Sequence, residues 1–331
     1  MAKRVLVTDY AWPSLEIERS ILDEVGAELL VAQSGHEAEL VSLAPAADAI
    51  LTNWKKVPRA ALDAAPQCLV VSRYGIGVDN IPVEHATTLG ILVTNVPDFC
   101  LEEVSDHTLA LLLACARRVT RFDRLSHTGQ WDLSLARGLP RLRDQTLGLI
   151  GFGHTARAVV PKALGFGLRV LAYTPRLQPG REDGAELTND LEKLLSEADY
   201  VSLHAPSTPS TRGLIGEAEL RTMKTTGYLI NTSRGALVNE GDLLRALREG
   251  WIAGAALDVL GQEPPPASHP LLACDNAVIT PHAAFYSDAS IAEVEAKATR
   301  NVVDVLCGRL PANVVNPAVT HQGNFRLARN L

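Results

Sequence analysis

The chain has 331 residues, of which 47% are hydrophobic, and carries a formal net charge of −7. That length suffices for two domains with separate cores. The acidic balance argues against nucleic acid or an anionic membrane as a partner, and the longest apolar run, 109–116, is too short to span a bilayer. Residues 1–10 have the pattern of a first strand and not of a signal peptide. Five scattered cysteines without a CxxC motif favour reduced thiols in a cytoplasmic protein, and no metal site is expected.

Short apolar runs typical of strands alternate with amphipathic segments typical of helices along the whole chain. In the first hundred residues, segment 15–25 has the helical pattern. Four runs there have the strand pattern: KRVLVTD, DAILTNW, CLVVSRY and ILVTNV. Beyond Pro97 we predict one long helix over 101–126 and then a looser stretch that contains Trp131. Because this first series has four or five strands and no glycine-rich turn of its own, we interpret it as a substrate domain.

A second series of strands and helices begins near residue 146. Helical segments such as 241–250 separate most of its six strand-like runs. These runs are TLGLIGFG, LRVLAYT, YVSLHAP, GYLINTS, AALDVL and AVITPHA. Six parallel strands opened by a glycine-rich turn form a complete nucleotide-binding domain. A last helix is predicted over 287–306, and we expect it to return and cover the first series.

The glycine-rich turn lies in LGLIGFGHTA, between the first strand of the second series and the helix that follows. Gly151, Gly153 and Ala156 match the G-x-G-x-x-[G/A] spacing. The first glycine allows a tight turn, the second lets the backbone approach a pyrophosphate, and the small third residue lets helix and strand pack closely. We therefore predict dinucleotide contacts here, including His154 and Thr155. The alternative interpretation is an ordinary tight turn between strand and helix.

The next strand ends in Thr174, Pro175 and Arg176, where many dinucleotide-binding domains carry an acid that binds the adenosine ribose. Without a carboxylate at this position a 2′-phosphate is not repelled, and Arg176 can pair with it. The sequence therefore favours NADP(H), with Thr174 and Arg176 as cofactor contacts. NAD(H) stays open, because Arg176 can also be a solvated loop charge.

Six stretches together resemble the D-isomer-specific 2-hydroxyacid dehydrogenases, in the family's order and spacing. They are similar to the branch that includes phosphoglycerate dehydrogenase and the C-terminal-binding protein. The stretches are RYGIGVDNIP, LGLIGFGHTA, LHAPSTPSTRGLI, LINTSRGALVNEGDLLRAL, GAALDVLGQEPP and ITPHAAFYS. The resemblance implies an α/β fold of two doubly wound parallel-sheet domains. A Rossmann domain over 100–286 would be inserted into a flavodoxin-like substrate domain made of 1–99 and 287–331. It also implies a homodimer, which we place on the 101–126 helix and the Trp131 region.

The resemblance carries three catalytic positions onto Arg234, Glu263 and His282. A guanidinium is a permanent, two-pronged cation for the carboxylate and carbonyl oxygen of a 2-oxo acid. A histidine can deliver the proton that the new hydroxyl needs, and a neighbouring carboxylate favours the imidazolium. All three follow predicted strands, at the edge where doubly wound sheets bind ligands. Taken singly, each has a plainer interpretation as a structural histidine, a helix-capping arginine or a solvated loop acid.

Further cofactor contacts are implied only by the resemblance. Asp258 matches the acid expected to hold the nicotinamide carboxamide, and Thr232 is expected to contribute its backbone. Thr108 can equally be an ordinary helix residue. The remaining implied positions are His204, Pro206, Thr211 and Ala284.

The loop that begins at Arg73 is the predicted substrate-binding segment, comprising Arg73, Tyr74, Gly75 and Ile76. Exposed backbone N–H groups in such a glycine-containing loop can bind a carboxylate. Arg73 matches a substrate-contacting arginine of the C-terminal-binding-protein branch, with a local salt bridge as the alternative. Tyr74 is either an aromatic wall or part of the packing. Phe285 stands where the C-terminal-binding protein has tryptophan, so the substrate of that protein does not carry over directly.

These features predict an enzyme that transfers a hydride between a nicotinamide cofactor and a small 2-hydroxy or 2-oxo acid, as glyoxylate/hydroxypyruvate reductases do. A formate-type dehydrogenase is disfavoured because Pro281 stands where those enzymes carry glutamine. Two alternatives remain open. One is a dehydrogenase of a phosphorus acid, either phosphite or a hydroxyphosphonate. The other is an NAD(H)-sensing interaction protein resembling the C-terminal-binding protein.

Overall fold

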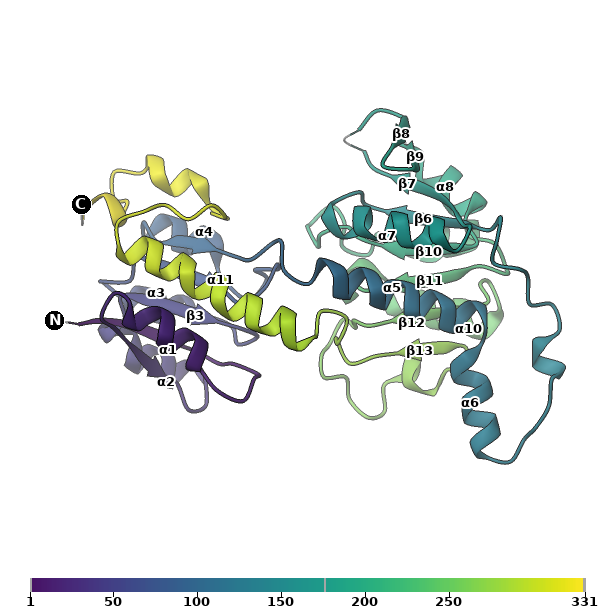
Figure 1. Cartoon of the computed structure of the whole chain (residues 1–331), viewed down its shortest axis with the longest axis horizontal. Helices are drawn as coiled ribbons and strands as arrows, with labels where there is room; N and C mark the ends of the chain where they lie inside the picture. The colour runs from purple at the N-terminus through teal and green to yellow at the C-terminus, as the bar shows by residue number, and fades with distance from the viewer. Residues whose placement is uncertain (1, 176, 330–331) are drawn as a thin grey trace. The chain divides into compact units, whose positions relative to one another are not determined.

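The computed structural model describes residues 2–175 and 177–329, which divide into two compact units. Unit 1 comprises the residues up to Phe99 together with those from Ser287 on, and unit 2 comprises Cys100–Tyr286. Each unit contains its own sheet with helices packed on it (Figure 1). The predicted fold class, two parallel-sheet α/β domains, is therefore confirmed. In the described residues no helix combines the length and the apolar character that crossing a membrane requires.

Within the described residues of unit 1 the strands form one parallel sheet in the order β2-β1-β3-β4-β5, the order found in flavodoxin-like folds. The strands are β1 (Lys3–Val7), β2 (Ala27–Val31), β3 (Ala49–Thr52), β4 (Val70–Arg73) and β5 (Leu92–Thr94). Every residue of β3 is buried, as expected for a parallel strand covered on both faces. The edge strand β2 is partly exposed.

The helices of unit 1 include a long C-terminal helix that packs on the sheet. They are α1 (Glu16–Asp23), α2 (Glu37–Leu43), α3 (Arg59–Asp63), α4 (Val83–Thr88) and α11 (Asp288–Leu306), with short 3-10 turns at Ala44–Ala46, Pro317–His321 and Leu327–Arg329. Figure 1 shows α11 beside α1, and α11 also contacts β3 and β4. Ser287 caps α11 by accepting the N–H of Ser290, and the Ser72 hydroxyl on β4 donates to the carbonyl of Ala298.

A buried acidic cluster joins α1, α11 and the loop after β4. Glu18 is 0% exposed and Glu295 is 5% exposed, and the Tyr74 hydroxyl donates to Glu18 Oε1 over 2.9 Å. Burial, followed by the nearby Glu18 carboxyl, raises the pKa of Glu295 to about 8. Burial also raises the pKa of Glu18, although the hydrogen bond from Tyr74 opposes it. Two buried carboxyls this close cannot both ionise at low cost, so the cluster retains a proton in the folded state.

This retained proton predicts a pH-dependent stability. An unfolded chain releases the Glu295 proton near the ordinary pKa of 4.5, whereas the folded cluster holds it to about pH 8. The free energy of unfolding should therefore fall as pH rises between these values. Glu295→Gln keeps the shape without the charge, so we expect a flatter profile of Tm against pH and a higher Tm than wild type at pH 9. A difference of 1 kcal/mol corresponds to roughly 2–4 °C in a domain of this size.

The matched control is Glu293→Gln on the same helix, where the carboxylate is 44% exposed and pairs with Lys297. This surface substitution should leave the shape of the profile unchanged. Equal pH profiles for wild type and Glu295→Gln would show that the buried pair does not control the alkaline stability.

Within the described residues of unit 2 the strands form a sheet in the order β13-β12-β11-β10-β6-β7-β9-β8. All six predicted strands are present and parallel to their neighbours: β6 (Thr146–Ile150), β7 (Arg169–Tyr173), β10 (Tyr200–Leu203), β11 (Tyr228–Asn231), β12 (Gly254–Leu257) and β13 (Ala277–Ile279). Two short strands were not predicted, β8 (Gly180–Glu182) and β9 (Ala185–Thr188). They extend the edge at β7, where the charged sequence REDGAE lacks an apolar run.

Helices of unit 2 cover both faces of this sheet. They are α5 (Leu101–Ala116), α6 (Val119–His127), α7 (His154–Gly165), α8 (Leu191–Glu197), α9 (Glu217–Thr222) and α10 (Glu240–Glu249), with 3-10 turns at Ser134–Ala136, Gly235–Leu237 and Pro270–Ala273. One core contains residues of α8, α9 and α10, such as Leu194, Leu220 and Leu243. The opposite core contains residues of α5 and α7, such as Leu112 and Val159.

The prediction of one helix over 101–126 is wrong. The helix is interrupted between α5 and α6 because Arg118 adopts a left-handed conformation with φ of 52°. α5 buries its apolar side chains against α7 and the sheet, whereas every residue of α6 is at least partly exposed. The core therefore ends where α5 ends, although the helical sequence pattern continues.

Candidate active site

The three predicted catalytic residues follow three neighbouring strands of the unit 2 sheet. Arg234 comes three residues after β11, Glu263 six residues after β12, and His282 three residues after β13. β11 pairs with β12 and β12 with β13, all in parallel, so the carboxyl ends of these strands lie at one edge. This is the edge at which open α/β sheets bind ligands.

His282 and Glu263 form a direct pair at this edge. Nδ1 of His282 lies 2.6 Å from Oε2 of Glu263, and both side chains are about one-third exposed, at 34% and 35%. Oε1 of Glu263 accepts the N–H of Leu260, which fixes the carboxylate within its own loop. Because a carboxylate can only accept, Nδ1 carries a hydrogen and the second ring nitrogen, Nε2, is the one available for proton transfer.

The negative charge of the Glu263 carboxylate is stabilised by neighbouring groups. Partial burial raises the pKa of Glu263, while the hydrogen bond and charge of His282 lower it. A bond from the N–H of Leu260 and the positive charge of Arg234 add to the lowering, so the pKa lies below its ordinary value. Glu263 is therefore a carboxylate at neutral pH, as a partner for an imidazolium must be.

Arg234 is positioned by a close approach of two loops. In the loop after β11, the side-chain amide of Asn231 donates to the Arg234 carbonyl, and Nη1 of Arg234 donates to the carbonyl of Ser233. A Cβ on the next residue, Gly235, would lie 2.0 Å from the carbonyl carbon of Leu260 in the loop after β12. A glycine is required there, because any side chain would separate the loop of Arg234 from the loop of Glu263.

The backbone of His282 is held in an unusual conformation. Its φ is 54°, in the left-handed region that a non-glycine residue adopts at a cost of roughly 1–2 kcal/mol. Its N–H donates to the Asp258 carbonyl at 2.8 Å. The Asp258 carboxylate is buried and accepts the N–H groups of Ala283 and Ala284, each at 2.9 Å. Strain kept at a candidate catalytic residue requires such surrounding bonds.

The glycine-rich turn has the geometry that a dinucleotide needs. Gly151 has φ of 100°, and a Cβ there would lie 2.6 Å from the His204 carbonyl oxygen. At Gly153, by contrast, a Cβ would meet no atom within 4 Å, so the space beside this backbone is open. α7 begins at His154 with Gly153 as its N-cap, and Ala156 is fully buried. The N–H groups of this first helical turn have no acceptor within the helix and suit a pyrophosphate.

Comparison with known proteins identifies the family of this chain. The family model of the D-isomer specific 2-hydroxyacid dehydrogenase, NAD binding domain, matches residues 109–284. The chain is also 44% identical over 262 residues to a glyoxylate reductase of Korarchaeum cryptofilum. This alignment covers 78% of this chain and 79% of the relative. The chain belongs to the D-isomer-specific 2-hydroxyacid dehydrogenase family. The resemblance found in the sequence is thereby confirmed.

Solved structures are similar over nearly the whole dehydrogenase. An NADPH-dependent glyoxylate/hydroxypyruvate reductase from Sinorhizobium meliloti has a TM-score of 0.83 at 28% identity and covers 95% of this chain and 97% of that chain. A D-isomer specific 2-hydroxyacid dehydrogenase from Lactobacillus delbrueckii ssp. bulgaricus in an NAD-complexed form has a TM-score of 0.79 at 28% identity. The match covers 95% of this chain and 100% of that chain. The protein is therefore a nicotinamide-dependent oxidoreductase that transfers a hydride between its cofactor and a 2-hydroxy or 2-oxo acid.

The other predicted cofactor contacts of the dehydrogenase lie in the same unit. The hydroxyls of Thr108 and Thr232 are buried and lie 3.0 Å apart, joining α5 to the loop after β11. Burial lowers the pKa of His204 to about 4, so its ring, bonded through Nε2 to the Ser202 hydroxyl, is neutral.

Two loops complete the set. The Thr211 hydroxyl donates to the Pro206 carbonyl at 2.6 Å and thereby closes the loop after β10. Thr174 is buried directly after β7, and Arg176 lies outside the described residues. The roles of these residues toward the cofactor remain predictions.

The predicted substrate-binding loop belongs to unit 1. The Arg73 guanidinium occupies the space that a Cβ on Gly75 would fill. The absence of a side chain at Gly75 therefore lets the guanidinium lie against the loop. Ile76 is 39% exposed. Tyr74 is only 2% exposed and its hydroxyl donates to Glu18, so its side chain belongs to the packing and does not form an aromatic wall.

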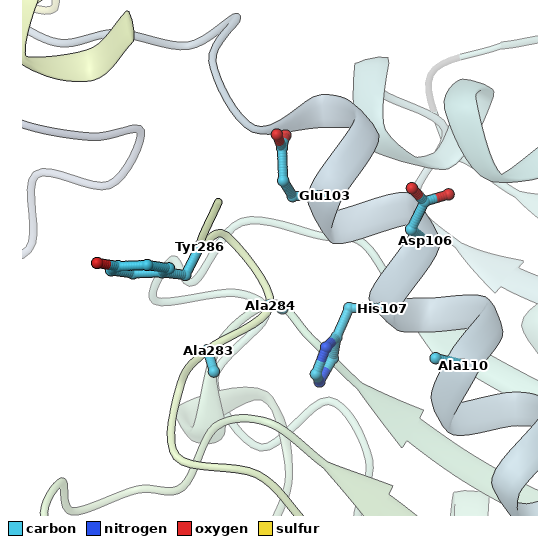
Figure 2. A pocket seen from close by; sticks show the side chains of 7 residues that line it. All are labelled: Glu103, Asp106, His107, Ala110, Ala283, Ala284 and Tyr286. Carbon is cyan, nitrogen blue, oxygen red and sulfur yellow. The ribbon is translucent and has the colours of Figure 1, made fainter. Parts of the chain in front are cut away.

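A hollow of about 320 Å³ lies between the start of α5 and the loop after β13 (Figure 2). Its lining is Glu103, Asp106, His107, Ala110, Ala283, Ala284 and Tyr286. Sequence reasoning missed His107, although it directly precedes Thr108 in a stretch singled out for cofactor contact. A histidine on a predicted helix carries no signal of its own, because its partners are distant along the chain.

Proposed function

We propose that this dehydrogenase reduces glyoxylate and hydroxypyruvate to the corresponding 2-hydroxy acids. The observation that carries the proposal is the pairing of His282 with Glu263 beside the positive charge of Arg234. This arrangement offers a cation for a carboxylate and a proton donor for a carbonyl oxygen at one edge of the sheet. The names of the Korarchaeum and Sinorhizobium proteins support the same class of small 2-oxo acid.

We infer a separate role for each of these side chains. When bound, the reduced nicotinamide supplies the hydride that adds to C2 of the oxo acid. Arg234 binds the substrate carboxylate and carbonyl oxygen with its forked donors. His282 gives a proton from Nε2 to the oxygen that becomes the hydroxyl, and in oxidation it takes that proton back. Glu263 holds Nδ1, fixes the orientation of the ring and stabilises the imidazolium.

We propose NADP(H) as the preferred cofactor, held by the glycine turn and the first turn of α7. No carboxylate stands at 174–176, directly after β7, to repel a 2′-phosphate. Within this segment Thr174 donates its N–H to the Thr188 carbonyl of β9, which fixes the end of the strand. The NADPH-dependent Sinorhizobium reductase supports this preference, and the NAD-complexed Lactobacillus enzyme keeps NAD(H) as the alternative.

We also propose a homodimer that uses α6 and the segment after it. In unit 2 these parts extend away from the sheet (Figure 1). Trp131 is 90% exposed and Leu133 is 78% exposed. Large apolar side chains this exposed are typical of a surface that associates. The expected result of light scattering is a molar mass twice that of the chain.

Initial rates with a panel of acids test the proposed reaction. Glyoxylate, hydroxypyruvate, pyruvate and a bulkier 2-oxo acid are each assayed with NADPH and with NADH, and phosphite is assayed with the oxidised cofactors. We expect the highest kcat/KM with glyoxylate or hydroxypyruvate and NADPH, and Arg176→Asp should shift the preference toward NADH.

Three results would contradict these assignments. Turnover of phosphite alone would favour the phosphorus-acid alternative. Dinucleotide binding without turnover of any acid would favour a sensing protein. An unchanged cofactor preference in Arg176→Asp would remove the basis for NADP(H).

A further inference from the structure

His107 on α5 makes a hydrogen bond to the loop that carries His282. Its Nε2 lies 3.0 Å from the hydroxyl oxygen of Thr280, and that oxygen lies 2.6 Å from Oδ1 of Asp258. In Figure 2 the imidazole points away from the carboxylates of Glu103 and Asp106. The ring therefore faces the loop after β13 and not the charged side of the hollow.

The direction of these hydrogen bonds follows from the donors available. The Asp258 carboxylate is an acceptor, so the Thr280 hydroxyl must give it its single hydrogen. The Thr280 oxygen is then left as an acceptor, and Nε2 of His107 must carry the hydrogen between them. His107, Thr280 and Asp258 form a directed chain from α5 to the end of β12.

The hydrogen bonds of Asp258 hold the backbone on both sides of His282. Asp258 binds Thr280, two residues before His282, and also binds the N–H groups of Ala283 and Ala284 directly after it. The N–H of His282 itself donates to the Asp258 carbonyl. The left-handed backbone at His282 is thus enclosed by bonds that converge on one aspartate.

The buried carboxylate of Asp258 also lies close to the His107 ring itself. The Asp258 side chain is 0% exposed, and Nε2 of His107 lies 3.6 Å from its Oδ1. The His107 side chain is 24% exposed and so connects the buried group with solvent. A buried charge is costly unless donors surround it.

We propose that His107 is a positioning residue that holds the loop of His282 through Thr280 and Asp258. This inference rests on the proposed catalytic role of His282. His107 does not need to touch the substrate for this role. It donates a hydrogen bond to the Thr280 hydroxyl. The bonds of Asp258 to Thr280, Ala283 and Ala284 then fix the geometry of the loop. A displacement of about 1 Å at a reacting group can cost roughly 100-fold in rate.

Substitutions that separate ring shape from hydrogen bonding test the proposal. His107→Phe keeps a ring but removes the donor, and we expect kcat to fall roughly 10–100-fold with little change in the KM for the acid. His107→Gln places an amide N–H near the position of Nε2 and should recover most of the rate. His107→Asn is the matched control, because its shorter amide overlays the Nδ1 end and should not recover it.

A double-mutant cycle tests the proposed connection. Thr280→Val removes the bridging hydroxyl at nearly constant shape and should lower kcat as His107→Phe does. The double variant should lose no more than either single variant, because both remove the same chain. Additive losses, equal rates for the Gln and Asn variants, or a wild-type kcat in His107→Phe would each overturn the inference.

His282→Asn measured in the same series distinguishes the two levels of proposal. If His282→Asn is inactive and His107→Phe has wild-type kcat, the positioning role alone is wrong. If His282→Asn retains full activity, the proposed function is wrong at its proton donor. Thermal unfolding and NADPH fluorescence on every variant show that each is folded and binds cofactor.

Discussion

His282→Asn should lower kcat for a 2-oxo acid by about 10²–10⁴-fold, the usual contribution of a positioned proton donor. The asparagine side chain can still hydrogen-bond to Glu263, so the loop should keep its shape while losing the group that transfers a proton. NADPH affinity should change little, because the glycine turn at Gly151 and Gly153 lies in a different loop. Steady-state kinetics together with NADPH fluorescence titration measure both quantities.

His36→Asn is a suitable control, because His36 is exposed and makes no side-chain cap to its helix. Its kcat should equal that of wild type. A His282→Asn protein that binds NADPH ten times more weakly but turns over at the wild-type rate would assign the residue to cofactor binding and not to proton transfer.

Arg234→Gln should produce the second large effect, a fall in kcat/KM of roughly 10²–10³-fold, the loss expected when one preorganised donor to a developing charge is removed. Part of the loss should appear as a higher KM, since the substrate carboxylate loses its cation. Arg234→Lys keeps the charge but not the forked geometry, so it should recover only part of the loss. The measurement is full kinetics for glyoxylate and hydroxypyruvate.

Arg245→Gln is the matched control for this substitution. Arg245 also lies in unit 2, but it is 50% exposed and pairs with Glu217 and Asp242 on the surface. It should leave kcat/KM unchanged. If Arg234→Gln has wild-type kcat/KM while His282→Asn is inactive, another cation binds the carboxylate and the role proposed for Arg234 is wrong.

Elements with a strong local pattern could be predicted from the sequence. The six predicted strands of unit 2 lie within apolar runs, the helix from Asp288 to Leu306 is a long amphipathic segment, and the structure contains all of them. The short strands β8 and β9 were missed, because strands of three and four residues with charged side chains have no clear periodicity. The interruption of the helix at Arg118 was also missed. It lies where the buried core ends, and the helical sequence pattern continues past that point.

The order of residues along the chain by itself determined the family, the two sheets and the residue types needed for hydride and proton transfer. Tertiary structure alone decided which groups touch. It turned Tyr74 into the core toward Glu18, placed His107 against Thr280, and gave the expected pair of His282 and Glu263 its bonded atoms, Nδ1 and Oε2. The physical reason is that periodicity and motif spacing report on neighbours within a few residues. Hydrogen bonds between side chains depend on how strands and helices separated by tens or hundreds of residues pack together.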